Sequence, residues 1–561
     1  MSPAQRAQIQ PGPVQADVER ASRRLAERTA VRRIWGGDPS LWTEDPAHSR
    51  IVANRLGWLS VVETMQARLD ELRAFADDVR AAGLRRAVLL GMGGSSLAPE
   101  MLRATFGTAP GFLELFVLDT TDPATIASLE GAAGEAHGVP LRETLFVVAS
   151  KSGTTVETLS HLAYFWDTSG GRGEQFIAIT DSGTPLESLA HERGFRRVFL
   201  NPPDIGGRYS ALSYFGLVPA ALLGLDVNAF LDRARDMAER CRQERENPGL
   251  ELGALLGGGA RAGRDKVTLL APDEVGSFSG WIEQLLAEST GKQGTGLIPV
   301  VDEPLGGPEV YGSDRLFARF LLGPGPVERE LGVLIAAGHP LVTIRLQDRL
   351  DLGAELFRWE FATAVAGAVL AIDPFDEPNV QESKDNTRRL LDEFEENGRL
   401  PEPAPIAEAD GLSLSGALRS ATLEGGLAEF LASARPGDYL ALQAYLPCRD
   451  EVRARLQAIR WGLRDRLRVA TTLGFGPRFL HSTGQLHKGG PPSGLFLQLT
   501  ADDTVDLPIP GQRFSFGVLR RAQALGDFQA LQARGRPAVR FHLGADVEAG
   551  LRRLENLLSA P

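Results

Sequence analysis

Hydroxyl side chains crowd one turn of the chain, directly after an apolar run at 145–148. A helix that starts there exposes backbone N–H groups, which favour an anion such as a phosphate. Capping alone needs a single serine or threonine, and this turn offers several around a glycine, so we predict phosphate binding over simple capping. The spacing differs from that of a P-loop, so a nucleoside triphosphate is not indicated. The residues proposed for this turn are Ser150, Lys151, Ser152, Thr154 and Thr155.

A carboxylate and an amide share one face of a predicted helix. Gln284 and Glu288 are four residues apart, so their side chains project from the same side. Glu288 is expected in the last turn, beside a glycine-rich loop, where the helix dipole disfavours a negative charge. Such a position raises the pKa of a carboxyl group toward that of a general base. An ordinary exposed glutamate is the alternative.

Two cations stand in segments that could serve the same chemistry. Arg208 follows two glycines and precedes a long apolar stretch, which places its guanidinium at a loop tip where it could stabilise an oxyanion. Lysine is rare, since only five of the 60 basic residues are lysines, and arginine cannot replace it where geometry or proton affinity matters. One of the five, Lys384, lies inside a predicted helix. A surface arginine and a solvated lysine are the respective alternatives.

A glycine-rich turn at 91–96 lies between a short apolar run and a predicted helix, and it contains Gly94 and Ser95. Glycines allow a ligand to approach the backbone closely, and a helix start favours anions. The third glycine is misplaced for a dinucleotide-binding fingerprint. A ligand site and a plain structural turn are equally compatible with this segment.

The elements that must position these motifs alternate between strands and helices. Residues 16–80 have apolar positions at three- and four-residue spacing, which predicts helices. Five short apolar runs then predict strands, most of them separated by helices. Apolar strands of this kind are typical of a parallel sheet that is covered on both faces. The predicted strands are 87–90, 115–118, 145–148, 176–179 and 198–200.

A second α/β unit begins near residue 267, and a third follows a proline-rich linker at 400–405. We therefore predict an α/β fold with four regions. They are an N-terminal helical segment (1–80), a phosphate-binding domain (81–245), a domain that carries Glu288 (246–400) and a C-terminal α/β extension (401–561). In the last two regions strands are predicted at 267–270, 317–322, 341–344, 439–445 and 496–499, and a helix at 353–370.

Composition and charge narrow the function classes. Hydrophobic residues make up 43% and charged residues 24% of the 561 residues, as in soluble globular proteins. The net charge is −12 and there is no Lys/Arg-rich run, which argues against nucleic-acid and membrane partners. Two distant cysteines, Cys241 and Cys448, match no metal-ligand spacing. The first 15 residues lack the apolar core of a secretory signal, and the apolar stretch 209–225 is interrupted by proline and serine, so we expect a buried helix there and a cytoplasmic location.

Taken together and in this order, the motifs resemble those of the phosphoglucose isomerase (glucose-6-phosphate isomerase) family over roughly residues 80 to 390. With the segment 479–491, the chain is most similar to the isomerase half of transaldolase–phosphoglucose isomerase fusions. The resemblance implies two sugar-isomerase (SIS) domains with parallel sheets, followed by a C-terminal extension. It also implies a homodimer that interconverts glucose 6-phosphate and fructose 6-phosphate through a cis-enediol, in glycolysis and gluconeogenesis, without a metal or organic cofactor.

The resemblance also assigns roles. Glu288 would move a proton between C2 and C1, Arg208 would stabilise the enediolate, and Gln284 would orient the substrate. Lys384 would assist opening of the hexose ring. The sugar phosphate and neighbouring hydroxyls would be held by Gly94, Ser95, Ser150, Lys151, Ser152, Thr154 and Thr155. These roles require that the hydroxyl-rich turn, Glu288 and Arg208 share one cleft.

Two departures from the family pattern leave questions open. The family has a histidine downstream of the glutamate that helps to open the ring, and here the corresponding region, 311–316, contains none. His481 and His487 are substitutes by residue type, and we include His487 in the catalytic set, whereas Asp314 and Arg315 are substitutes by position. The 80 residues before the first strand cannot hold a transaldolase barrel. The role of residues 410–561 is left open.

Two alternative functions are compatible with these residues. Because C2 epimers share the enediol, a dual-specificity phosphoglucose/phosphomannose isomerase is the first. SIS domains also serve in regulators, so a non-catalytic sugar-phosphate sensor is the second. The joint presence of Glu288, Arg208 and Lys384 favours an enzyme, since a sensor needs only the phosphate loop.

Overall fold

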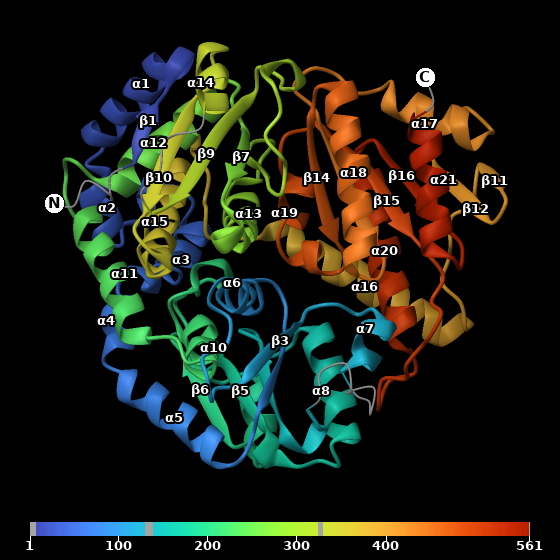
Figure 1. The fold of residues 1–561 in the computed structure, drawn as a ribbon, viewed down its shortest axis with the longest axis horizontal. Coiled ribbons are helices and arrows are strands. Elements are labelled where there is room, and N and C mark those ends of the chain that lie inside the picture. The colour runs from blue at the N-terminus through green and yellow to red at the C-terminus, as the bar shows by residue number, and fades with distance from the viewer. Residues whose placement is uncertain (1–6, 130–138, 324–328, 560–561) are drawn as a thin grey trace.

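The computed structural model describes residues 7–129, 139–323 and 329–559, which form three α/β units packed around a common centre (Figure 1). The sheet of the first unit has the order β3-β2-β4-β5-β6, and all its neighbouring strands are parallel. The five strands predicted for this unit are confirmed. They are β2 (Arg86–Gly91), β3 (Glu114–Leu118), β4 (Thr144–Ala149), β5 (Phe176–Asp181) and β6 (Arg197–Asn201).

Side-chain alternation along the central strands explains why this sheet is covered on both faces. In β2, Leu89 belongs to one hydrophobic cluster, whereas Val88 and Leu90 belong to another. Successive side chains point to opposite faces of a strand, so each face has its own core. Helix α10 (Tyr214–Leu223) packs in the first cluster and α8 (Val156–Thr168) in the second. The other helices of this unit are α6 (Leu97–Phe106), α7 (Pro123–Ser128), α9 (Pro185–Glu192) and α11 (Val227–Cys241).

The sheet of the second unit takes in the beginning of the described chain. Its order is β1-β10-β9-β7-β8, with β1 (Gln8–Gln10) antiparallel to β10 and the other neighbours parallel. The sequence does not predict β1, because three residues carry no detectable period. The remaining strands are β7 (Lys266–Leu270), β8 (Ile298–Val300), β9 (Arg315–Leu322) and β10 (Leu341–Leu346).

Helices surround the second sheet and extend along the first, and those predicted between residues 16 and 80 are confirmed. The N-terminal helices are α1 (Gln15–Glu27), α2 (Ala30–Trp35), α3 (Pro46–Ala53), α4 (Val61–Gln66) and α5 (Leu69–Ala81). The helices of the second unit are α12 (Pro248–Arg261), α13 (Ser277–Thr290), α14 (Arg329–Ala336) and α15 (Leu352–Leu370). The last of these matches the helix predicted at 353–370.

The sheet of the third unit is mixed, with the order β11-β12-β16-β15-β13-β14. The strands predicted at 439–445 and 496–499 are confirmed as β13 (Tyr439–Tyr445) and β15 (Gly494–Thr500). An apolar-run criterion misses β14 (Ala470–Phe475), which contains two threonines, and β16 (Ala538–His542), which has a central arginine. The other elements are β11 (Ala407–Ala409), β12 (Leu412–Gly416), α17 (Leu423–Leu431), α18 (Asp450–Leu467), α19 (Gly484–Gly489) and α21 (Val547–Ser559).

Two helices, α16 (Pro378–Asn397) and α20 (Phe516–Ala533), join the third unit to the first. Leu390 of α16 and Leu519 of α20 belong to the same hydrophobic cluster as Phe146 of β4. Burial of a shared apolar core holds the two units in one arrangement. This arrangement brings the turn after β4, helix α13 and the segment before α19 to the same cavity.

Within the described ranges, no helix combines the length and the apolar character needed to cross a membrane. The apolar stretch 209–225 instead contains α10, whose ten residues are all buried. The prediction of a buried helix in this stretch is confirmed.

Candidate active site

A cavity of about 520 Å³ brings together most of the residues singled out from the sequence. Its walls come from loops of the first unit, from α13 of the second, from α16, and from the short 3-10 turn Arg478–His481 of the third. Residues from all three units are therefore needed to build it. The predicted residues that line the cavity are Gly94, Ser95, Lys151, Ser152, Thr155, Arg208, Gln284, Glu288, Lys384 and His481.

Glu288 lies in the last turn of α13, as predicted, and it is only 8% exposed. Gln284, one turn earlier, donates from Nε2 to Glu288 Oε2 at 3.0 Å. The same Nε2 also donates to the backbone carbonyl of His481 at 2.8 Å. The helix face predicted from the four-residue spacing thus points into the cavity, and its amide links the carboxylate to the third unit.

Arg208 is fully enclosed and holds five acceptors at once. Its Nη1 donates to Glu288 Oε1 at 3.1 Å and to Glu377 Oε2 at 3.0 Å. Its Nε donates to Ser289 Oγ, and its Nη2 to the carbonyls of Pro374 and Asp376, each at 2.8 Å. The structure therefore places Arg208 and Glu288 in one cleft, as the predicted roles require.

Close packing of two glycine loops positions Arg208. A methyl group added at Gly94 would overlap the backbone carbonyl of Gly207. Only a residue without a Cβ allows the turn after β2 to approach the loop that carries Arg208 so closely. Gly94 thus contributes to the site because it has no side chain, and the residue also lines the cavity.

Burial and neighbouring charges set the protonation of the two carboxylates on Arg208. Burial raises the pKa of Glu288, the guanidinium of Arg208 opposes this, and the carboxylate of Glu377 adds to it, so that the pKa is raised overall. For Glu377, the effect of burial is outweighed by Arg208, and its pKa is lowered. Glu377 therefore stays ionised to a lower pH than Glu288 does. The raised pKa of Glu288 suits a residue that acts as a general base.

Some residues of the hydroxyl-rich turn line the cavity, and others form hydrogen bonds within the turn. Ser152 and Thr155 line the cavity. The expectation that Ser150 also faces a ligand is not met, because its buried hydroxyl accepts from the Gly153 N–H at 3.1 Å and bonds Thr155 Oγ1 at 3.0 Å. Thr154 lines an adjoining cavity of about 430 Å³ instead. Ser150 is thus a residue that shapes the turn.

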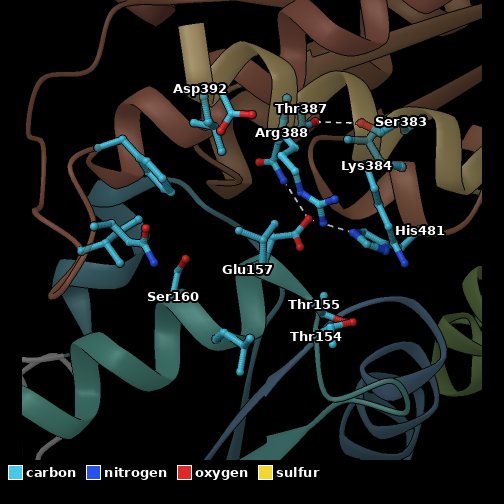
Figure 2. Close-up of a pocket in the computed structure, with 18 of the residues that line it drawn as sticks. Thr154, Thr155, Glu157, Ser160, Ser383, Lys384, Thr387, Arg388, Asp392 and His481 are labelled. Carbon is cyan, nitrogen blue, oxygen red and sulfur yellow. Dashed lines mark hydrogen bonds and ion pairs between the residues drawn. The ribbon is translucent and has the colours of Figure 1, made fainter. Parts of the chain in front are cut away.

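Two lysines of the predicted site lie in different electrostatic surroundings. Lys151 forms an ion pair with Asp181 and donates to the carbonyl of Pro203 at 3.1 Å, so its charge is partly neutralised. Lys384 is exposed on α16 and lines both the main cavity and the adjoining one. Figure 2 shows its side chain beside His481, above the turn with Thr154 and Thr155.

The structure contradicts the placement of His487 in the catalytic set. Helix α19 turns this side chain into an aromatic cluster of the third unit, where its ring packs against Phe496 at a centroid distance of 5.1 Å. Its Nδ1 lies 3.2 Å from Gln443 Nε2. Burial lowers the pKa of His487 well below its usual value, and the residue does not line the cavity.

The substitutes proposed by position are also held elsewhere. Arg315, at the start of β9, is fully buried and donates to Thr268 Oγ1 at 2.7 Å and to Glu303 Oε1 at 3.1 Å. Asp314 is buried beside Lys266, with 3.3 Å between Oδ2 and Nζ. Both residues stabilise the second unit away from the cavity.

Two carboxylates at the site were given no role from the sequence. Glu377 lies in the segment before α16 and pairs with Arg208. Glu157 lies in the hydroxyl-rich motif and is 2.8 Å from His481 Nε2 through Oε1. Neither is among the residues selected from the sequence, because the partner of each lies far away along the chain.

Comparison with known proteins points to one family. The phosphoglucose isomerase family model matches residues 48–312. The glucose-6-phosphate isomerase of Rubrobacter xylanophilus is 30% identical over 369 residues, which cover 55% of this chain and 83% of that protein. The glucose-6-phosphate isomerase of Prochlorococcus marinus is 35% identical over 214 residues, 36% of this chain and 40% of that protein. The chain spans half or less of the length of the first four relatives.

Solved structures support the fold. A hypothetical protein from Thermus thermophilus superposes with a TM-score of 0.55 at 24% identity, covering 68% of this chain and 99% of that one. A glucose-6-phosphate isomerase from Chlamydia trachomatis gives a TM-score of 0.52 at 19% identity, covering 68% of this chain and 86% of that one. The predicted α/β fold class is confirmed, while the likeness to transaldolase fusions stays a prediction. From the matched motifs and the Rubrobacter relative, the chain belongs to the phosphoglucose isomerase family.

Proposed function

We propose that this chain is a glucose-6-phosphate isomerase, which converts glucose 6-phosphate and fructose 6-phosphate reversibly through a cis-enediol. One observation carries the proposal. The buried carboxylate of Glu288 lies 3.1 Å from the guanidinium of Arg208, in a cavity that Ser152 and Thr155 also line. Abstraction of a proton next to a carbonyl needs a positioned base and a cation near the oxygen that becomes negative.

The geometry supports different roles for the residues that line the cavity. Ser152 and Thr155, at the start of α8, bind the phosphate, because hydroxyls and a helix N-terminus both favour an anion. Binding of this remote group fixes the reacting carbons near Glu288. Glu288 takes the proton from C2 and returns it to C1, which is feasible because the two carbons of a planar enediol are neighbours. Gln284 holds the carboxylate in place, and Arg208 stabilises the enediolate.

An enzyme explains the site better than a sugar-phosphate sensor does. A buried carboxylate with a raised pKa and a fully engaged arginine both carry a large desolvation cost. A sensor would need only the anion-binding turn, so it offers no reason for this cost. Perturbed titratable groups in a cavity are typical of catalysis. The lining residues give no specific support for mannose 6-phosphate, so glucose 6-phosphate is the proposed substrate.

Glu288→Gln tests the proposal. The variant should lose about 1,000-fold in kcat for fructose 6-phosphate, because removal of a general base costs about 10²–10⁴-fold. It should still bind a six-carbon aldonic acid phosphate, since the phosphate contacts remain. Glu274→Gln, at an exposed position just before the same helix, is the matched control and should keep full turnover. Retained turnover in Glu288→Gln would refute the assignment.

We propose in addition that the enzyme acts in the cytoplasm, in glycolysis and gluconeogenesis, as a homodimer. The domain division at 81–245, 246–400 and 401–561 is also a proposal. It is supported by the presence of one sheet in each region, although β1 adds the N-terminal residues 8–10 to the second sheet.

A further inference from the structure

The adjoining cavity of about 430 Å³ extends from the proposed active site into the space between α8 and α16. Thr155, Lys384 and His481 line both cavities, so the two are in contact at these residues. Beyond them the adjoining cavity continues past Ser160 of α8 and Arg388 of α16 to the loop before α20. The proposed isomerisation assigns no role to this outer part, although its size is typical of a small-molecule site.

One face of α16 separates positive from negative charge along the adjoining cavity. Lys384, Arg388 and Asp392 follow one another at four-residue spacing, so they share this face. All three are exposed and line the cavity, together with Glu395. In the part of the chain that the structure describes, none of the four side chains has an ion-pair or hydrogen-bond partner. Figure 2 shows Lys384 beside His481 at one end of the cavity and Asp392 at the opposite end.

A third carboxylate in the lining, that of Glu157, is already engaged. Its Oε1 accepts from His481 Nε2 at 2.8 Å and from Gln523 Nε2 at 2.7 Å. The charges that remain for a ligand are therefore the two cations toward the active site and the two carboxylates at the far end.

Apolar side chains line the adjoining cavity between these charged ends. They come from three segments of the chain, and the loop before α20 contributes an aromatic ring. A flat, apolar ring of a ligand would be well accommodated between such walls. The residues are Leu159 and Ala163 of α8, Leu391 of α16, and Ile509 and Phe514 of the loop.

A buried hydroxyl also faces this cavity. Ser160 is 5% exposed, and in Figure 2 its oxygen points into the cavity. Within the described ranges, no hydrogen bond engages this hydroxyl. It is therefore suited to a hydrogen bond with a polar group of a ligand.

We propose that the adjoining cavity binds an organic phosphate whose flat ring carries an amino group, such as a nucleoside monophosphate, and that this ligand inhibits the enzyme. The phosphate lies at Lys384 and Arg388, because a guanidinium and an ammonium both favour it. The ring lies between the apolar walls, its amino group donates to Asp392 or Glu395, and Ser160 bonds the polar linker. Since Lys384 lines both cavities, its ammonium cannot serve this phosphate and the substrate at once. The binding depends on the adjoining cavity alone, whereas the inhibition rests on the proposed isomerase function.

Titration calorimetry of the full chain with adenosine monophosphate (AMP) tests the binding. Arg388→Met should weaken the Kd of AMP about tenfold, as for the loss of a charge-assisted contact to phosphate. Inosine monophosphate has a carbonyl oxygen where AMP has the amino group, so the wild type should bind it about tenfold more weakly than AMP. Arg389→Met is the matched control, because this neighbouring cation of α16 pairs with Glu393 and does not line the cavity. Its Kd for AMP should equal that of the wild type.

Ser160→Leu gives the second measurement, because the larger side chain fills the adjoining cavity and leaves the main one open. This variant should lose AMP binding and keep kcat for fructose 6-phosphate within about twofold of wild type. At an AMP concentration equal to its Kd, the apparent KM for glucose 6-phosphate should roughly double in the wild type, as for mutually exclusive binding, and stay unchanged in Ser160→Leu.

Three results would overturn the inference. They are a wild type that does not bind AMP, equal Kd values for the two nucleotides, and AMP binding that both Arg388→Met and Ser160→Leu leave intact. Binding as expected without a change in KM would overturn the inhibition. A wild type that binds AMP as expected but has no turnover would instead overturn the proposed function, while the binding site would be supported.

Discussion

Glu288 and Arg208 form a buried ion pair, with 3.1 Å between Oε1 and Nη1. The two residues are 80 positions apart and come from different units. Four further acceptors hold the guanidinium, so it stays in place when Glu288 gains or loses its proton. A cation that need not move is what stabilises developing charge without reorganisation.

The first prediction concerns the geometry of this cation. Arg208→Lys keeps the charge, but a single ammonium cannot reach the five acceptors that the planar guanidinium bridges. We expect kcat to fall about 100-fold, as for the loss of a preorganised donor, with a smaller change in KM. Steady-state kinetics would show this, and Arg197→Lys, half-exposed on β6, is the control that should stay within twofold. A wild-type kcat in Arg208→Lys would mean that charge alone is sufficient.

The second prediction concerns pH. Burial raises the pKa of Glu288 and the carboxylate of Glu377 adds to this effect. A base that must be deprotonated therefore loses activity as pH falls through that raised pKa. Glu377→Gln removes the neighbouring charge, lowers the pKa of Glu288 and should shift the acidic limb of the kcat/KM profile to lower pH. The profile measured for both proteins decides this, and an unchanged limb would show that Glu377 does not act on the base.

The third prediction tests the close approach of two loops. Gly94→Ala forces a methyl group against the carbonyl of Gly207 and should displace Arg208, so kcat should fall at least tenfold. Gly280→Ala is the matched control on α13, because a Cβ there meets nothing within 4 Å. Alanine is favoured over glycine in a helix by about 1 kcal/mol, so this control should raise the melting temperature slightly and leave kcat unchanged.

The fourth prediction separates ligand-binding hydroxyls from structural ones. Ser152→Ala should raise KM for glucose 6-phosphate about tenfold, which corresponds to one hydrogen bond of about 1.4 kcal/mol to a charged group, with little effect on the melting temperature. Ser150→Ala removes the buried contacts of the turn and should lower the melting temperature as well. If the two variants show the same KM and the same stability, the division of the turn described above is wrong.

The fifth prediction assigns Arg315 to stability. Arg315→Met removes two hydrogen bonds to the buried Glu303 and leaves Arg464, at 3.8 Å, as its ion-pair partner. We expect this to cost about 2 kcal/mol in the free energy of unfolding, as for hydrogen bonds to a charged group. Urea denaturation would measure this loss. The kcat of the folded protein should stay within twofold of wild type, because Arg315 does not line the cavity. A large loss of kcat at unchanged stability would instead make Arg315 a candidate for a catalytic role.

Local sequence was sufficient to predict the strands of the first unit, the position of the hydroxyl-rich turn and the face of α13. Each of these depends on a pattern within a few residues: an apolar run, a cluster of hydroxyls after a strand, or a four-residue spacing. Strands β14 and β16 were not predicted, because polar residues interrupt their apolar runs. They are strands because they pair with β13 and β15, which lie elsewhere in the sequence.

Only the tertiary structure shows which of His481 and His487 lies at the cavity. The two histidines are six positions apart in one segment, so no local pattern tells them apart. His481 lies at the cavity beside Glu157, which is 324 positions away in sequence and 2.8 Å away in space, whereas His487 packs against Phe496. Contacts between units arise when separate cores pack together, and a period of two or of three to four residues carries no information about them. For the same reason the third unit could be recognised as an α/β unit from its strands, while its contribution to the cavity required the assembled fold.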